Sequence, residues 1–394
     1  MGDDAYEKRR NMKALVKGNN EFAFDLYNQV RGLKGENVIF SPFSISIAIA
    51  MVYAGTLEKT EEEIAQVLHF TLGKEKVHEY FKMLKNYLVD GAARRGYTLN
   101  IANALWVKPG YPLLEDFMAV IAASYGGALF ETDFSKPGVA AGQINGWISQ
   151  QTNFMIKDLI DPTSLSAATS LIVTNAIYFL GKWLDEFDKR YTRPMPFWTT
   201  RSHSLTVNMM FQTKTFEYAS GSGLQMLEMP YKSGVSSWNK DYDMSMVFLL
   251  PDDIEGLPSL EQSLSAGMLD QWIEQLRPNL ADVYIPRFTM TLGFSLGRML
   301  SNMGMNLALS FKDANFLGMT TKPGYYIQDV VHKAYVRVDE EGTEAAAATA
   351  ITMAPTGPPP KKIVFKADHP FLFLIRDIKT GTILFLGRVV EPSE

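Results

Sequence analysis

Cysteine is the clearest absence from this chain of 394 residues, which contains none. A disulfide, a zinc site with thiolate ligands, an iron–sulfur cluster and a cysteine nucleophile are therefore excluded. A secreted protein of this size can fold without disulfides, so the absence leaves the compartment open.

Long hydrophobic runs are absent as well. The longest, residues 45–54, has about half the length that a membrane-spanning helix needs. The first five residues, Met1-Gly2-Asp3-Asp4-Ala5, are polar and charged, so the sequence as given has no signal peptide. We expect a soluble protein without a membrane partner, either a mature secreted form or a cytoplasmic one.

The chain has no excess of positive charge: it contains 38 Lys and Arg against 43 Asp and Glu, and its formal net charge is -5. That balance argues against nucleic acid as a partner. Histidine occurs only 5 times, and no two histidines have ligand spacing on one helix. His78-Glu79 begins like a zinc-protease motif, but Lys82 stands where the second histidine is needed. We expect no metal and no cofactor.

One pair of short motifs resembles a catalytic site. Ser237-Trp238-Asn239-Lys240 and Lys379-Thr380-Gly381 fit two of the three elements of penicillin-binding proteins and serine β-lactamases. The first lies in a polar stretch with no apolar period, and the third element is missing between them. Lys379-Thr380-Gly381 reads equally well as the tip of a β-hairpin between strands at residues 371–377 and 382–389.

Helical patterns dominate the first half of the chain and strand patterns the second half, without regular alternation. We expect helices over residues 76–90, 114–125, 139–159, 259–276 and 296–303, and a central strand in the apolar run 170–180. This order predicts an α+β fold. No internal repeat and no Gly/Ser linker divides the chain, so we expect a single domain over residues 1–394.

Five segments together resemble the serpin family, the inhibitors that trap serine proteases. Residues 37–45 resemble its strand-to-helix start, 174–183 its central strand with a following tryptophan, 331–334 and 339–347 the approach to its reactive-centre loop, and 367–373 with 386–389 its C-terminal signature. The resemblance implies a monomer with a dominant central mixed β-sheet, two smaller sheets, eight or nine helices and an exposed reactive-centre loop at about residues 340–362.

The resemblance also assigns site residues. It implies a loop hinge made of Glu340, Glu341, Gly342, Thr343, Glu344, Ala345, Ala346, Ala347 and Ala348. It implies a polar cluster under the sheet, the shutter, made of Ser41, Ser44, Asn175 and His332. Trp183 matches the residue beneath the point of loop insertion, the breach. From the residues alone, His332 is equally well a satisfied core histidine and Trp183 a core aromatic.

The segment after the hinge has two possible structures. By propensity alone, the four alanines predict an exposed helix followed by a proline linker. Written as a strand, one face carries only small or uncharged residues, namely Thr343, Ala345, Ala347, Thr349 and Ile351. Neither a proline nor a charge on that face blocks insertion into a sheet, so we expect an inhibitory member of the family rather than a non-inhibitory carrier or chaperone.

The family's loop register sets the expected reactive bond. With Glu340 as the first of seventeen residues, Thr356 donates the acyl group and Thr356–Gly357 is cleaved; Met353 and Ala354 are alternatives in a slipped register. The residues before the bond suit an elastase-like or subtilisin-like serine protease with a small pocket. The inhibitor needs no catalytic residue of its own. The lysines near residues 74–85 alternate with acids, so we expect no heparin-type site.

Overall fold

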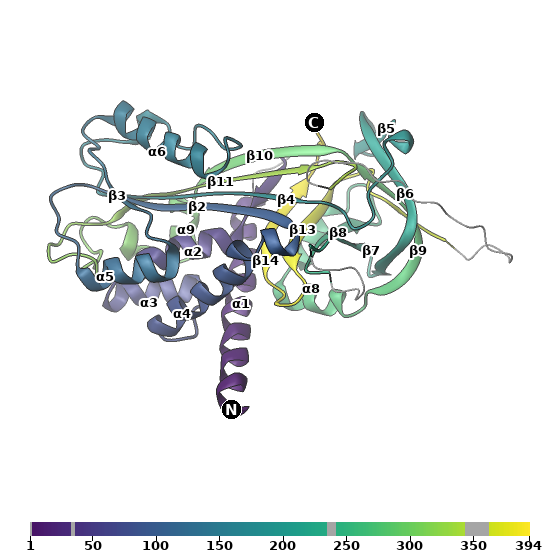
Figure 1. The fold of residues 1–394 in the computed structure, drawn as a ribbon. Coiled ribbons are helices and arrows are strands. Elements are labelled where there is room, and N and C mark those ends of the chain that lie inside the picture. The colour runs from purple at the N-terminus through teal and green to yellow at the C-terminus, as the bar shows by residue number, and fades with distance from the viewer. Residues whose placement is uncertain (1, 33–35, 235–241, 343–361) are drawn as a thin grey trace.

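The computed structural model describes residues 2–32, 36–234, 242–342 and 362–394. In these parts of the chain nine α-helices surround two β-sheets (Figure 1). The helices are α1 (Gly2–Val30), α2 (Pro42–Tyr53), α3 (Glu58–Val67), α4 (Lys74–Lys85), α5 (Glu115–Val120), α6 (Pro137–Gln151), α7 (Leu257–Ser263), α8 (Ala266–Ile273) and α9 (Gly297–Asn302).

The five-stranded sheet is mixed and carries the site. Its strands lie in the order β10 (Phe288–Ser295), β11 (Ile327–Val338), β4 (Leu171–Gly181), β2 (Tyr97–Val107) and β3 (Leu129–Glu131). The two inner neighbours β11 and β4 are parallel, whereas β2 and β10 run antiparallel to them. The expected central strand is confirmed as β4, which is buried along nearly its whole length.

The second sheet has nine strands. They are β1 (Val38–Phe40), β14 (Ile383–Val389), β13 (Phe371–Asp377), β8 (Met244–Pro251), β7 (Leu224–Pro230), β6 (His203–Gly221), β9 (Arg277–Pro286) and β12 (Ile363–Lys366) in order, with β5 (Arg193–Thr200) beside β6. The two smaller sheets that we expected are therefore continuous in the described residues. Strand β6 is 19 residues long and joins them, because it pairs with β5 over residues 203–209, with β9 over residues 209–218 and with β7 over residues 217–221.

Helices cover both faces of the five-stranded sheet (Figure 1). Ile144 and Ile148 of α6 pack on one face in a cluster with alternate residues of β2 and β4. Helix α2, every residue of which is buried, packs beneath the other face. The period of two along the strands accounts for this division, since neighbouring side chains point to opposite faces. Because both faces are covered, β4 reads in sequence as a continuous apolar run.

Two helix predictions need correction. Helix α6 ends at Gln151 rather than near residue 159, because Thr152 turns its hydroxyl onto the Ile148 carbonyl at 2.8 Å and the next two residues have positive φ. The helix expected over residues 259–276 is instead the pair α7 and α8, in which Ser265 caps the second helix by accepting a hydrogen bond from Met268 N.

Candidate functional site

The hinge leaves the five-stranded sheet through a tight turn at the end of β11. Asp339 N donates to Gly342 O at 2.9 Å, and Gly342 N donates back to Asp339 O at 3.2 Å. Gly342 also forms a β-bridge with Lys182, just beyond the end of β4. Its φ is +118°, and a Cβ there would lie 2.5 Å from the Trp183 amide nitrogen, so only glycine fits. This turn reverses the direction of the chain beside β4.

Two buried carboxylates fix the turn from outside. Glu340 accepts a hydrogen bond from Thr192 Oγ1 at 2.6 Å and lies 3.6 Å from the Arg287 guanidinium. Glu341 lies 2.5 Å from Lys189 Nζ. The backbone amide of Glu341 also bonds the Asp339 carboxylate, whose pKa is raised because burial outweighs these contacts. The first three hinge residues are thus docked, while Thr343, Glu344 and Ala345 to Ala348 lie outside the described residues.

Trp183 lies directly beneath this turn. Its indole nitrogen donates to Asp339 O at 3.0 Å, and its backbone amide donates to Glu341 O at 2.9 Å. The ring is 1% exposed and stacks on Tyr231 with 4.6 Å between centroids. The expected breach residue therefore holds the hinge turn through two hydrogen bonds.

The four expected shutter residues come together beneath the middle of the sheet. Ser41 caps α2 by accepting from Ser44 N at 3.2 Å, and Ser41 N donates to His332 Nε2 at 3.2 Å. His332 Nδ1 bonds the Asn175 side-chain oxygen, and Asn175 Nδ2 donates to Ser44 Oγ. All four residues are fully buried. They connect α2 with β4 and β11.

A fifth member of this cluster, Asn103 of β2, was missed by the sequence analysis. It accepts a hydrogen bond from Asn175 Nδ2 and donates to Ser44 O at 3.1 Å. Asn103 is directly opposite Asn175 in the β2–β4 pairing. The signal that could have revealed it is a polar residue at an inward position of an otherwise apolar strand segment.

The hydrogen bonds define the charge of His332. A backbone N–H only donates, so Nε2, which faces Ser41 N, must be unprotonated, and the proton is on Nδ1 toward Asn175. Complete burial lowers the pKa of His332 to about 3, which keeps the ring neutral. A proton added to Nε2 would face another N–H donor.

The expected reactive bond, Thr356–Gly357, and its alternatives Met353 and Ala354 lie outside the described residues. So does Ser237 of the hydrolase-like motif. Its companion motif is described: Lys379-Thr380-Gly381 forms the turn of the β13–β14 hairpin, which confirms the hairpin interpretation. Lys379 Nζ lies 3.0 Å from the Asp243 carboxylate.

The described residues contain neither a metal-binding cluster nor a membrane-spanning helix. No group of three or more His, Cys, Asp or Glu side chains could hold a metal ion. In the same parts of the chain, no helix has the length and apolar character to cross a membrane.

Comparison with known proteins agrees with this geometry. The family model "Serpin (serine protease inhibitor)" matches residues 17–392. Human Serpin B4 is 36% identical over 402 residues, covering 97% of this chain and 100% of that protein. The leukocyte elastase inhibitor of Xenopus tropicalis is 36% identical over 390 residues, with 97% and 100% covered. An uncharacterized serpin-like protein of Thermococcus kodakarensis is 38% identical over 387 residues, with 97% and 87% covered.

Solved structures of similar fold include uncleaved ovalbumin and human thyroxine-binding globulin with thyroxine. Ovalbumin superposes with a TM-score of 0.85 at 29% identity, over 96% of this chain and 100% of that one. Thyroxine-binding globulin superposes with a TM-score of 0.87 at 28% identity, over 98% and 100%. The chain belongs to the serpin family, whose model is described as serine protease inhibitor and not as an enzyme, and one of its relatives is named as a leukocyte elastase inhibitor.

Proposed function

We propose that this protein is an inhibitory serpin that traps a serine protease by inserting its cleaved loop between β4 and β11. The observation that carries the proposal is the position of the hinge turn. Strands β4 and β11 are direct parallel neighbours from Ile327 to Tyr335, and Gly342 reverses the chain at the end of that seam. Residues beyond Gly342 therefore start beside the seam into which they would insert.

The length of the loop suits such an insertion. From Thr343 to Thr356, a strand that rises about 3.3 Å per residue reaches roughly 45 Å. A dozen or so new ladder hydrogen bonds at ~1 kcal/mol each sum to the order of 10 kcal/mol. This is enough to distort the catalytic site of an attached protease, where individual oxyanion-hole donors contribute about 3–4 kcal/mol. The protease would remain as an acyl-enzyme on Thr356.

The shutter lies across the seam that must open. His332 and Asn175 are direct partners in the β11–β4 pairing, and their side chains bond each other. Separating the strands breaks that bond, while Asn175 keeps Ser44 and Asn103 on its own side. We infer that this cluster sets how readily the sheet opens, since a buried network resists loss of any one member.

We also propose that the protein is a monomer, that its partner is a protease, and that it has no heparin-type site for a polyanion. Three lysines of α4 already have acidic partners. Lys74 lies 2.7 Å from Glu61, Lys76 2.7 Å from Glu7, and Lys85 3.2 Å from Asp90. A paired, mixed surface attracts a polyanion weakly compared with a continuous basic stripe.

The test is incubation with elastase-like, subtilisin-like, chymotrypsin-like and trypsin-like proteases, followed by a denaturing gel and mass spectrometry. We expect a band of the joined proteins that survives denaturation with an elastase-like or subtilisin-like enzyme, and a released peptide that begins at Gly357. The matched control is Thr356→Arg, which should transfer trapping to the trypsin-like enzyme. Cleavage in the loop without a stable band for any enzyme would refute trapping.

A carrier function is the second candidate, because one similar fold is that of a globulin solved with thyroxine. The uncharged face that begins at Thr343 argues against it. Loop cleavage without any gain in thermal stability would favour the carrier.

A further inference from the structure

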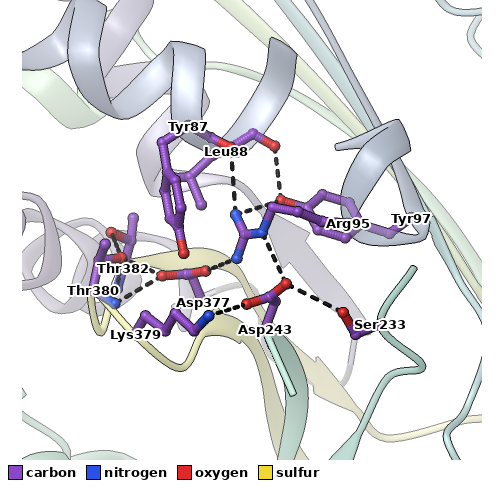
Figure 2. Close-up of polar contacts among 10 residues, drawn as sticks. All are labelled: Tyr87, Leu88, Arg95, Tyr97, Ser233, Asp243, Asp377, Lys379, Thr380 and Thr382. Carbon is purple, nitrogen blue, oxygen red and sulfur yellow. Dashed lines mark hydrogen bonds and ion pairs between the residues drawn. The ribbon is translucent and has the colours of Figure 1, made fainter. Parts of the chain in front are cut away.

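A buried cluster of charges lies beside the breach and belongs to neither the hinge nor the shutter (Figure 2). Its members are the buried Arg95, Asp243 and Asp377 and, at its rim, Lys379, whose side chain is 51% exposed. Asp377 is fully buried, and Arg95 and Asp243 are less than a tenth exposed. Burying a charge costs free energy unless the charge is paired. The pairs therefore indicate which elements this cluster holds together.

Arg95 is the centre of the cluster. Its Nη2 donates to Asp377 Oδ1 at 2.5 Å, and its Nε lies 3.2 Å from Asp243 Oδ2. Nη1 donates to the Tyr97 hydroxyl at 2.9 Å, and the guanidinium lies over the Tyr87 ring at 4.0 Å from its centroid. The planar fork of arginine suits this contact with two acids at once.

The two acids are themselves held in place. Asp377 Oδ2 accepts from the backbone and side chain of Thr380 at 2.8 and 2.7 Å. Lys379 Nζ lies 3.0 Å from Asp243 Oδ1. Burial alone would raise the pKa of Asp243, but the contacts with the positive charges of Lys379 and Arg95 outweigh it and the pKa lies below its usual value. These contacts therefore hold Asp377 in place on the β13–β14 hairpin and Asp243 in place just before β8.

These contacts join the two sheets at one end. Arg95 precedes β2, whose first residue, Tyr97, pairs with Gly181 at the end of β4. Asp243 precedes β8 and Asp377 ends β13, two paired strands of the nine-stranded sheet. Figure 2 shows Arg95 reaching from the helical segment above to both acids below it. The junction is at the end of the β2–β4 pair where the hinge turn docks.

Loop insertion requires a movement at this junction. One added strand widens the five-stranded sheet by about 4.8 Å. Strand β10 packs on the nine-stranded sheet, since Phe288 lies 5.5 Å from Phe373 of β13 between ring centroids. It is also bonded to the segment after β14, because Thr289 N donates to Ser393 O at 2.6 Å. The chain after β4 is also bonded to the end of β7, with Leu184 N donating to Pro230 O at 2.9 Å and Lys232 N to Lys182 O at 2.7 Å. We infer that the β2–β4 pair, joined over the full length of both strands, is the part that moves, and that these bonds open together with the contacts of Arg95. Contacts of 2.5 and 3.2 Å at Arg95 do not survive a shift of that size.

We propose that Arg95, Asp243 and Asp377 form an ionic latch that holds β2 against the nine-stranded sheet in the uncleaved protein and opens when the loop inserts. The inference rests on the proposed function. It makes Arg95 a positioning residue for insertion, because the latch stabilises the state before insertion and not the state after it. Removing the latch therefore lowers the barrier to opening the sheet.

The test uses the full chain with Arg95→Met and Asp377→Asn together, which removes one charge of each sign and leaves the Asp243–Lys379 pair. The melting temperature is measured for the uncleaved protein and for protein cleaved in the loop by a protease that it does not trap. We expect the uncleaved form to melt about 5 °C lower than wild type, because the buried Asp243 loses its contact with Arg95, and the cleaved form to be unchanged. Annealing of a synthetic peptide with the sequence of residues 343–354 should be about tenfold faster.

The matched control is Arg388→Met. Arg388 forms a buried pair with Glu261 at 2.8 Å, away from the seam, so its loss should lower both melting temperatures alike. If the double variant does not fold, Lys379→Met should give the same pattern at smaller amplitude, because Asp243 then loses one of its two cations.

Three outcomes separate the hypotheses. Equal losses in both forms of the latch variant would mean that the contacts persist after insertion and would overturn the latch. Unchanged peptide annealing would also overturn it. If wild-type protein gains no thermal stability on loop cleavage, the proposed function fails, whatever the variants do.

Discussion

Acidification should destabilise this protein through two buried histidines, and the structure sets the size of the effect. His332 and His78 are both held neutral. Burial lowers the pKa of His332 to about 3. Burial first, and the nearby Lys74 second, lower the pKa of His78 to about 4. The Nδ1 of His78 bonds the Tyr125 hydroxyl at 2.6 Å.

The sign follows from proton binding. Below the unfolded-state pKa of about 6.5, the unfolded chain takes up a proton at each histidine and the folded chain does not. The stability is therefore complete above pH 6.5 and is lost as the pH falls toward the folded values. Each pH unit in that window costs about 1.4 kcal/mol per histidine, so at pH 5 the two together cost about 4 kcal/mol.

The assay is urea unfolding of the uncleaved protein at pH values from 7.5 to 5, for wild type and for His332→Gln combined with His78→Gln. A glutamine at position 332 can still accept from Ser41 N. Between pH 7.5 and pH 5 the free energy of unfolding of wild type should fall by about 4 kcal/mol more than that of the double variant. His203→Gln, at an exposed position, is the control and should follow wild type. Parallel curves for wild type and the double variant would refute the reasoning.

Two further predictions concern backbone conformation. Phe154 has a φ of +63° and is 65% exposed, so Phe154→Gly should raise the free energy of unfolding by about 1 kcal/mol in urea unfolding, and a loss would contradict this. Gly342→Ala should lower it by about 2 kcal/mol or more, because the new Cβ meets the backbone of Trp183. Gly381→Ala is its control, since Gly381 also has positive φ but open space around it, and an equal loss there would show that φ alone is responsible.

Much of the fold follows from local patterns, and the site only partly does. The β4 strand was predictable because burial on both faces makes it continuously apolar. The resemblance to serpins supplied four of the five residues in the polar cluster around His332. Asn103 was missed although it is the polar residue on an otherwise apolar strand face, because that pattern alone does not say which buried groups the side chain will meet.

The ionic latch could not be predicted from the sequence, for a different reason. Arg95 and Asp377 are 282 residues apart, and each alone reads as an ordinary surface charge. The end of α6 was predicted wrongly for a related reason. Asn153 bonds the Tyr178 hydroxyl of β4 at 2.6 Å, a tertiary contact that holds the chain in a non-helical turn after α6. Such contacts depend on which elements become neighbours, and this is settled only when the whole core packs.

The parallel pairing of β4 with β11 has a consequence for the direction of the chain. Because the turn at Gly342 reverses the backbone, a strand inserted from it would run antiparallel to both neighbours. Insertion would exchange one parallel ladder, with its slanted hydrogen bonds, for two antiparallel ladders, whose bonds are perpendicular to the strands and slightly more stable per residue. The inserted state would then gain in the quality of its pairing as well as in the number of strands, and its reversal would require two ladders to break at once.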